Sequence, residues 1–114
     1  MAKEDYLREI FFLTDEGDSS TTTSELAERI EVTNASASEA VQKLEEDKLV
    51  CRAAYKGFTL SPMGKEEASK LAEKNRKLKE IFEKIGVEEF ESEADRIEHS
   101  ISIEALEKLE EKIL

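Results

Sequence analysis

The sequence contains few of the residues that cross-link small domains or interrupt regular structure: one cysteine, one proline, four glycines and no tryptophan in 114 residues. The single cysteine, Cys51, excludes an intramolecular disulfide and a zinc site built from several cysteines. No stretch approaches the roughly 20 consecutive apolar residues of a transmembrane helix, and no basic segment followed by an apolar one opens the chain. We therefore expect a cytoplasmic protein with no part in a membrane.

Catalytic patterns are also missing. The sequence shows no Ser/His or Cys/His arrangement typical of nucleophilic catalysis and no glycine-rich loop for phosphate. We therefore do not expect an enzyme or a small-molecule substrate.

Basic side chains are scarce as well. The chain has 17 lysines and arginines against 28 aspartates and glutamates, a formal net charge of −11. Such a charge argues against non-specific binding of nucleic acid. The exception is the window from Lys48 to Lys65, which holds four basic side chains and no acidic one. If any part of the chain contacts phosphates, this window is the best suited to it.

Residues 33–49 are predicted to form a helix with one buried face. Ala37, Val41 and Leu44 recur at helical spacing, and the hydroxyl of Thr33 can cap the first turn. The opposite face begins with small polar side chains, which fit into a DNA major groove without steric conflict. An ordinary amphipathic helix with a solvated face would show the same pattern. The neighbouring segments are therefore needed to distinguish the two interpretations.

Those neighbours predict a winged helix-turn-helix. Residues 2–17 form a first expected helix, with Gly17 as its stop, and a capping-box pattern begins a short second helix over residues 22–30. After residue 49 the runs LVCRA and FTL flank Tyr55-Lys56-Gly57, as in a β-hairpin with glycine at the position of positive φ. A helix-turn-helix followed by a hairpin is a winged helix.

In this arrangement we assign the start of the residue 33–49 helix to the major groove and nearby hydroxyl and basic groups to phosphates. Glu39 could accept a hydrogen bond from a cytosine amine, or it could be a surface acid; both interpretations stay open. The expected groove residues are Asn34, Ala35, Ser36 and Glu39, and the expected phosphate contacts are Thr33, Lys43, Arg52 and Lys56.

The rest of the chain is predicted to be helical. Ser61-Pro62 marks the start of a long helix that stops at Gly86, and two shorter helices follow over residues 89–100 and after Ser102. Many apolar residues in the last two helices indicate a partner surface, packing on the long helix, or both. The predicted fold is mainly α with a small β-hairpin wing: a winged helix-turn-helix DNA-binding domain over residues 1–64, then an α-helical metal-binding and dimerisation region over residues 65–114.

Two polar features stand out in this second half. Asn75 lies on the apolar stripe of the long helix, where it is either a satisfied core amide or a group facing an internal polar site. Asp95, Glu98 and His99 have the spacing of one helical face. Oxygen donors with one imidazole suit Mn²⁺ or Fe²⁺ better than thiol-seeking metals, and Asp5 could add a ligand from the first helix. The alternative is a surface charge cluster.

The succession of these segments resembles the DtxR/MntR metalloregulators. The matching strings run in order from EDYLR through SELAERI, VTNASASEAVQKLEEDKLV, YKGFTLSPMGKEEA and IGV to EADRIEHSIS. The resemblance implies a homodimer that binds a palindromic double-stranded DNA operator when metal is present. It maps the regulatory metal ligands to Asp5, Asp95, Glu98 and His99. Aspartates at positions 5 and 95 resemble the manganese-type members more than the iron-type ones.

Two positions depart from the family pattern. Arg8 stands where manganese-type members carry a carboxylate, and Asn75 stands where both types carry a histidine. We therefore expect one metal ion per subunit, Mn²⁺ or Fe²⁺. We also expect a short form of the family, without the SH3-like domain of longer members. The predicted function is a metal-responsive repressor of metal-homeostasis genes. The alternatives are a metal-independent winged-helix regulator and an acidic dimeric protein-interaction module.

Overall fold

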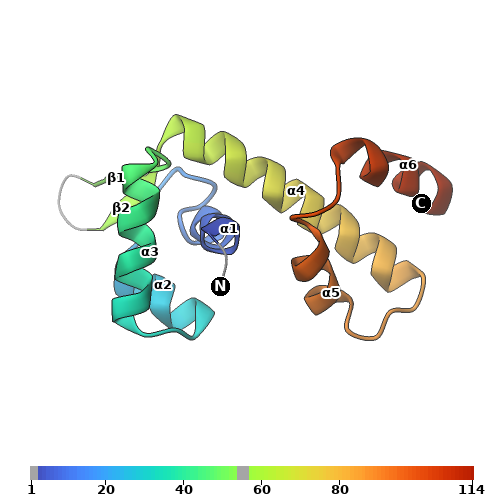
Figure 1. The fold of residues 1–114 in the computed structure, drawn as a ribbon, viewed down its shortest axis with the longest axis horizontal. Helices are drawn as coiled ribbons and strands as arrows, with labels where there is room; N and C mark the ends of the chain where they lie inside the picture. Colours follow the sequence, from blue (N-terminus) through green and yellow to red (C-terminus); the bar gives the residue numbers. More distant parts are fainter. Residues whose placement is uncertain (1–2, 54–56) are drawn as a thin grey trace. The chain divides into compact units, whose positions relative to one another are not determined.

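The computed structural model describes residues 3–53 and 57–114 (Figure 1). They form a winged helix-turn-helix followed by a helical region, as the sequence predicts, in two compact units that divide between Ser69 and Lys70. None of the helices in these ranges is long and apolar enough to cross a membrane. In chain order the elements are α1 (Lys3–Leu13), α2 (Thr23–Ile30), α3 (Asn34–Glu46), β1 (Val50–Arg52), β2 (Phe58–Leu60), α4 (Pro62–Lys84), α5 (Phe90–Ile97) and α6 (Ile103–Ile113).

The N-terminal unit packs α1, α2 and α3 around a shared apolar core. Each helix places its predicted apolar face inward, and β2 adds Phe58, which is fully buried. The contacts of α3 with α2, α1 and β1 fix its buried face and leave its opposite face in solvent. The fully buried aliphatic side chains of this core include Ile10, Leu26, Ala37 and Val41.

Helix α1 ends earlier than the sequence predicted. It stops at Leu13 rather than near Gly17, because Asp15 and Glu16 adopt left-handed conformations with φ of 48° and 59°. The Thr14 hydroxyl donates to the Ile10 carbonyl (2.7 Å) and accepts from the Gly17 backbone N–H (3.1 Å). These bonds close a turn, so the chain reverses four residues before the predicted stop.

The predicted caps Thr22 and Thr33 are present, and Ser102 caps α6 in the same way. The hydroxyls of Thr22, Thr33 and Ser102 accept backbone N–H groups at 3.1 Å from the residues three positions later, at the starts of α2, α3 and α6. The Glu25 carboxylate of the predicted capping box accepts the hydroxyl proton of Thr21 at 2.6 Å.

The substitution Thr22→Ala is expected to lower the free energy of unfolding by about 1 kcal/mol, because it leaves the Glu25 N–H without its cap. Urea unfolding followed by circular dichroism measures this loss. Thr22→Ser keeps the hydroxyl and should unfold at nearly the wild-type midpoint. Equal midpoints for the alanine and serine variants would show that the cap contributes nothing.

The wing is an antiparallel pair of β1 and β2, in which Val50 faces Leu60 and Arg52 faces Phe58. Gly57 has φ of +87°, the conformation expected of it. A contact that the sequence did not reveal ties the wing to the segment before α2: Thr21 and Phe58 exchange backbone hydrogen bonds at 2.9 and 2.8 Å. Although Thr21 lies between the two helices expected over residues 2–17 and 22–30, it is only 2% exposed.

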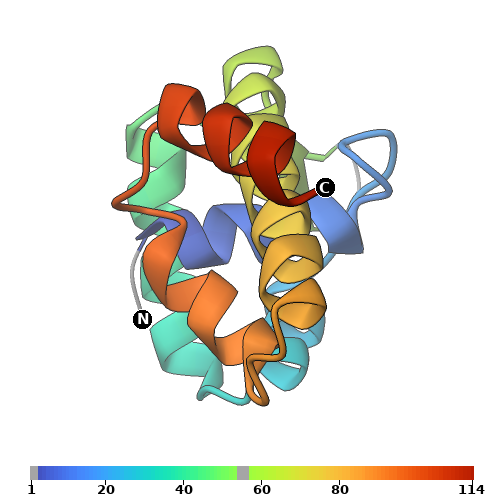
Figure 2. The same cartoon turned by 90° about the vertical axis from the view of Figure 1, so that its right-hand side faces the viewer.

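The C-terminal unit places α5 and α6 against the C-terminal half of α4 (Figure 2). Its core contains Leu78 and Ile81 of α4, Ala94 of α5 and Leu106 of α6. Helix α5 ends at Ile97 rather than Ser100, because Ser102 is extended to cap α6 and the chain must turn before it. The large apolar side chains left exposed in this unit include Ile85, Ile97, Ile103, Leu109 and Leu114.

Candidate metal centre and nucleic-acid interface

The exposed face of α3 carries the groups assigned to the DNA major groove. Thr33, Asn34, Ala35, Ser36, Glu39 and Lys43 are all exposed. The Thr33 hydroxyl caps the helix and donates to the Ser36 hydroxyl at 3.0 Å, so these two side chains are ordered at the start of α3. Lys56 lies outside the described residues.

Lys43 of α3 and Arg52 of β1, which are assigned to phosphates, are each paired with an acidic side chain. Lys43 Nζ lies 3.5 Å from the Glu39 carboxylate, and Arg52 Nε lies 3.2 Å from the Glu45 carboxylate. All four side chains are at least 38% exposed, so these ion pairs add little to stability. The first pair joins residues at i and i+4 of one helix, whereas the second joins α3 to β1.

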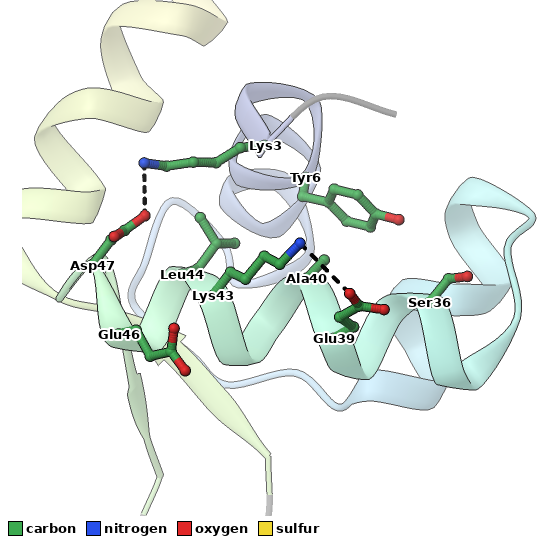
Figure 3. Close-up of a pocket in the computed structure, with 9 residues that line it drawn as sticks. All are labelled: Lys3, Tyr6, Ser36, Glu39, Ala40, Lys43, Leu44, Glu46 and Asp47. Carbon is green, nitrogen blue, oxygen red and sulfur yellow. Dashed lines mark ion pairs between the residues drawn. The ribbon is translucent and has the colours of Figure 1, made fainter.

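A groove of about 540 Å³ runs between the start of α1 and one side of α3 (Figure 3). Its rim carries two ion pairs, Lys43 with Glu39 and Lys3 with Asp47 at 2.8 Å. The hydrogen bond to Asp47 raises the pKa of the Lys3 ammonium above its ordinary value. Because its lysines face carboxylates, the groove carries no excess of positive charge for an anion. The lining residues are Lys3, Tyr6, Ser36, Glu39, Ala40, Lys43, Leu44, Glu46 and Asp47.

Asp5, the candidate ligand of the N-terminal unit, lies on α1 beside a buried arginine. The side chain of Asp5 is 19% exposed, and its Oδ1 lies 3.6 Å from an Nη atom of Arg8. The other Nη atom of Arg8 lies 3.6 Å from Glu9, and the arginine side chain is only 7% exposed. Arg8 therefore places a fixed positive charge beside the candidate ligand.

The other candidate ligands belong to the C-terminal unit, at the end of α5. The carboxylate of Glu98 is fully buried, with Oε1 3.8 Å from Nε2 of His99, whose side chain is 23% exposed. Glu98 is the C-cap residue that follows the last helical residue, Ile97, and His99 lies in the turn beyond it, not on the regular helical face that spacing predicted. Asp95 lies one turn earlier and accepts a hydrogen bond from Asn75 Nδ2 at 2.8 Å.

The Asn75–Asp95 bond decides a question that the sequence left open. The amide is a satisfied buried group, 3% exposed, and its partner is itself a candidate metal ligand. The sequence singled out both residues but could not predict their hydrogen bond, because they lie 20 positions apart on different helices.

Two family models match consecutive parts of the chain. Residues 1–58 match the N-terminal DNA-binding domain of iron-dependent repressors, and residues 61–113 match the metal-binding and dimerisation domain of those repressors. The chain belongs to the iron-dependent repressor family. The resemblance to DtxR/MntR regulators is thereby confirmed, and the family is one of transcriptional regulators.

Solved structures of this family share the fold. The manganese regulator SloR is 32% identical with a TM-score of 0.80, and the alignment covers 97% of this chain and 54% of that one. A manganese-dependent transcriptional repressor in complex with manganese is 29% identical with a TM-score of 0.82, covering 98% and 52%. IdeR of T. acidophilum, at 23% identity and a TM-score of 0.81, covers 98% and 54% and shows the fold alone. The chain thus spans about half the length of these solved chains.

Proposed function

We propose that this chain is a metal-responsive DNA-binding repressor of metal-homeostasis genes that acts as a homodimer on a palindromic operator. The observation that carries the proposal is the succession of a DNA-binding and a metal-binding and dimerisation family match along one chain. In this proposal residues 1–64 bind DNA and residues 65–114 hold the dimer contacts and most of the metal ligands.

The proposed metal is one Mn²⁺ or Fe²⁺ per subunit, held by Asp5, Asp95, Glu98 and His99. Three carboxylates and one imidazole form a hard donor set, which suits these ions. Burial of Glu98 fits this role, because a carboxylate removed from water is stabilised when it is paired or coordinates a metal ion. Two manganese-responsive relatives and the aspartates at positions 5 and 95 favour Mn²⁺.

In the proposed mechanism the positive charge of the metal ion would hold carboxylates of the N-terminal and C-terminal units together. Asp5 belongs to the N-terminal unit, whereas Asp95, Glu98 and His99 belong to the C-terminal unit. Shared ligation would restrict the motion of one unit against the other. In a dimer this would favour the spacing of α3 helices that fits half-sites about one helical turn (~34 Å) apart.

A homodimer is supported by the exposed apolar side chains of the C-terminal unit. Ile97, Ile103, Leu109 and Leu114 remain between 37% and 49% exposed although other apolar residues of α5 and α6 are buried. Apolar groups of this size gathered on short helices are typical of a protein interface. Self-association would supply the second α3 helix that a palindromic site requires.

On the DNA side, we propose that Asn34, Ala35, Ser36 and Glu39 enter the major groove. Lys43 and Arg52 would exchange Glu39 and Glu45 for phosphates, with further phosphate contacts from Thr33 and Lys56. Because few cations are involved and the chain is acidic, the affinity for DNA should depend only weakly on salt.

The test is a calorimetric titration of chelator-stripped protein with Mn²⁺, with Zn²⁺, and with Fe²⁺ under anaerobic conditions, beside His99→Ala. Selection of binding sites from random duplex DNA, with and without Mn²⁺, runs in parallel. We expect one ion per subunit in the wild type, loss of binding in His99→Ala, and enrichment of a palindrome only with metal.

Two other results would contradict this proposal in different ways. Enrichment of a DNA site without metal binding below millimolar concentrations would identify a metal-independent regulator, which the contact of Arg8 with Asp5 favours as the second candidate. Absence of both activities would point to a protein-interaction module.

A further inference from the structure

We propose that Asn75 is a positioning residue that fixes the Asp95 carboxylate for ligation of a single metal ion. The inference rests on the proposed metal site and concerns a residue that stands outside the ligand set. It starts from one bond within the C-terminal unit, the 2.8 Å contact between Asn75 Nδ2 of α4 and Asp95 Oδ1 of α5.

The chemistry of the contact fixes its direction. An ionised carboxylate only accepts hydrogen bonds, so the amide must present its NH₂ group and not its oxygen. With Oδ1 held by α4, the carboxylate plane of Asp95 is restrained, and its second oxygen has a defined direction. A ligand that is oriented before the metal arrives loses less conformational freedom on binding, and partners of this kind strengthen metal affinity.

The fold does not need an amide at position 75. Leu71 and Leu78 lie on the same side of α4, one turn before and one turn after, and Asn75 is 3% exposed between them. An aliphatic residue there would avoid the cost of burying a polar group. A second bond already ties α4 to the chain beyond α5, because Lys74 Nζ donates to the Ile101 carbonyl at 3.0 Å. Asn75 is therefore explained by what it does to Asp95.

The same bond also acts on the number of metal ions. A carboxylate that bridges two cations uses both oxygens, and here an N–H donor competes for Oδ1. In the other unit, the guanidinium of Arg8 lies beside Asp5 and supplies a positive charge where a second metal ion would otherwise supply one. Both replacements favour one ion per subunit.

The test uses Asn75→Leu, which keeps the number and branching of the side-chain heavy atoms and removes the N–H donor. We expect the Mn²⁺ dissociation constant, measured from the paramagnetic resonance signal of free Mn²⁺, to rise about 10- to 100-fold. The thermal midpoint of the metal-free protein should stay the same or increase. Lys74→Met is the matched control, because it breaks the neighbouring bond between elements without touching a candidate ligand, and it should keep the wild-type Mn²⁺ affinity.

The outcomes separate this inference from the proposed function. If wild-type protein binds no Mn²⁺ below millimolar concentrations, the metal site and the role of Asn75 fail together. If the wild type binds Mn²⁺ and Asn75→Leu binds it equally well, only the role of Asn75 fails. A lower thermal midpoint with unchanged affinity would make the amide purely structural. Should the leucine variant not fold, Asn75→Ala gives the same comparison.

Discussion

The substitution Glu98→Gln is expected to weaken Mn²⁺ binding by about 100-fold or more and to leave the metal-free protein at least as stable as the wild type. Changes to groups that merely support a metal ligand already cost 10- to 100-fold, so removal of a ligand charge should cost at least as much. Metal-free stability should not fall, because a buried neutral amide is easier to desolvate than the fully buried carboxylate of Glu98.

Calorimetry with Mn²⁺ and thermal unfolding in chelator measure the two halves of this result. Glu107→Gln is the matched control: it makes the same chemical change at an exposed position of α6 and should alter neither quantity. A Glu98→Gln variant that binds Mn²⁺ normally would remove Glu98 from the ligand set. A variant that unfolds without metal would instead assign the buried carboxylate to the fold.

The sequence was most informative where a structure is determined by neighbours along the chain. The caps at Thr22, Thr33 and Ser61 and the positive φ of Gly57 follow from local hydrogen bonding and backbone sterics, and the structure has them all. The buried faces of the helices were also predictable, because apolar residues recur at helical spacing within each segment. Resemblance to a family then ordered these segments into one fold.

Contacts between distant segments were not predictable in the same way. Nothing local to Thr21 indicates that it pairs with Phe58, or that Arg52 faces Glu45, because each contact depends on how elements pack. The candidate site shows the same division. Spacing along one segment selected Asp95, Glu98 and His99 as candidate ligands, whereas the hydrogen bond from Asn75 required the packing of α4 against α5.

Gly64 is the strongest example of a constraint that the sequence conceals, and Gly64→Ala is expected to destabilise the N-terminal unit by about 3 kcal/mol. Helix propensity predicts the opposite sign, because alanine in a helix is favoured over glycine by about 1 kcal/mol. Gly64 lies in the first turn of α4, however, and a Cβ atom there would sit 1.9 Å from the Leu49 carbonyl oxygen. That overlap forces the backbone to move, which costs more than propensity returns.

The movement cannot stay local, because hydrogen bonds of the Leu49 backbone link the end of α3 to the start of α4. Its carbonyl accepts the Ser61 N–H at 3.0 Å, and its own N–H donates to the Leu44 carbonyl of α3 at 2.9 Å. The Ser61 hydroxyl in turn donates to the Lys48 carbonyl at 2.7 Å and caps the Gly64 N–H at 3.0 Å. Displacing Leu49 therefore strains this set of bonds together and shifts the helix proposed to read DNA.

Urea unfolding gives the loss of stability, and binding to the selected DNA site should weaken in parallel. Gly86→Ala is the control, because its Cβ would meet no atom within 4 Å and only the φ of +88° opposes it, at about 1 kcal/mol. If Gly64→Ala unfolds at or above the wild-type midpoint, the Leu49 carbonyl can move without cost and α3 is not held through this contact. The expected order, Gly64→Ala well below Gly86→Ala, would show that close backbone approach and not helix propensity determines the residue at position 64.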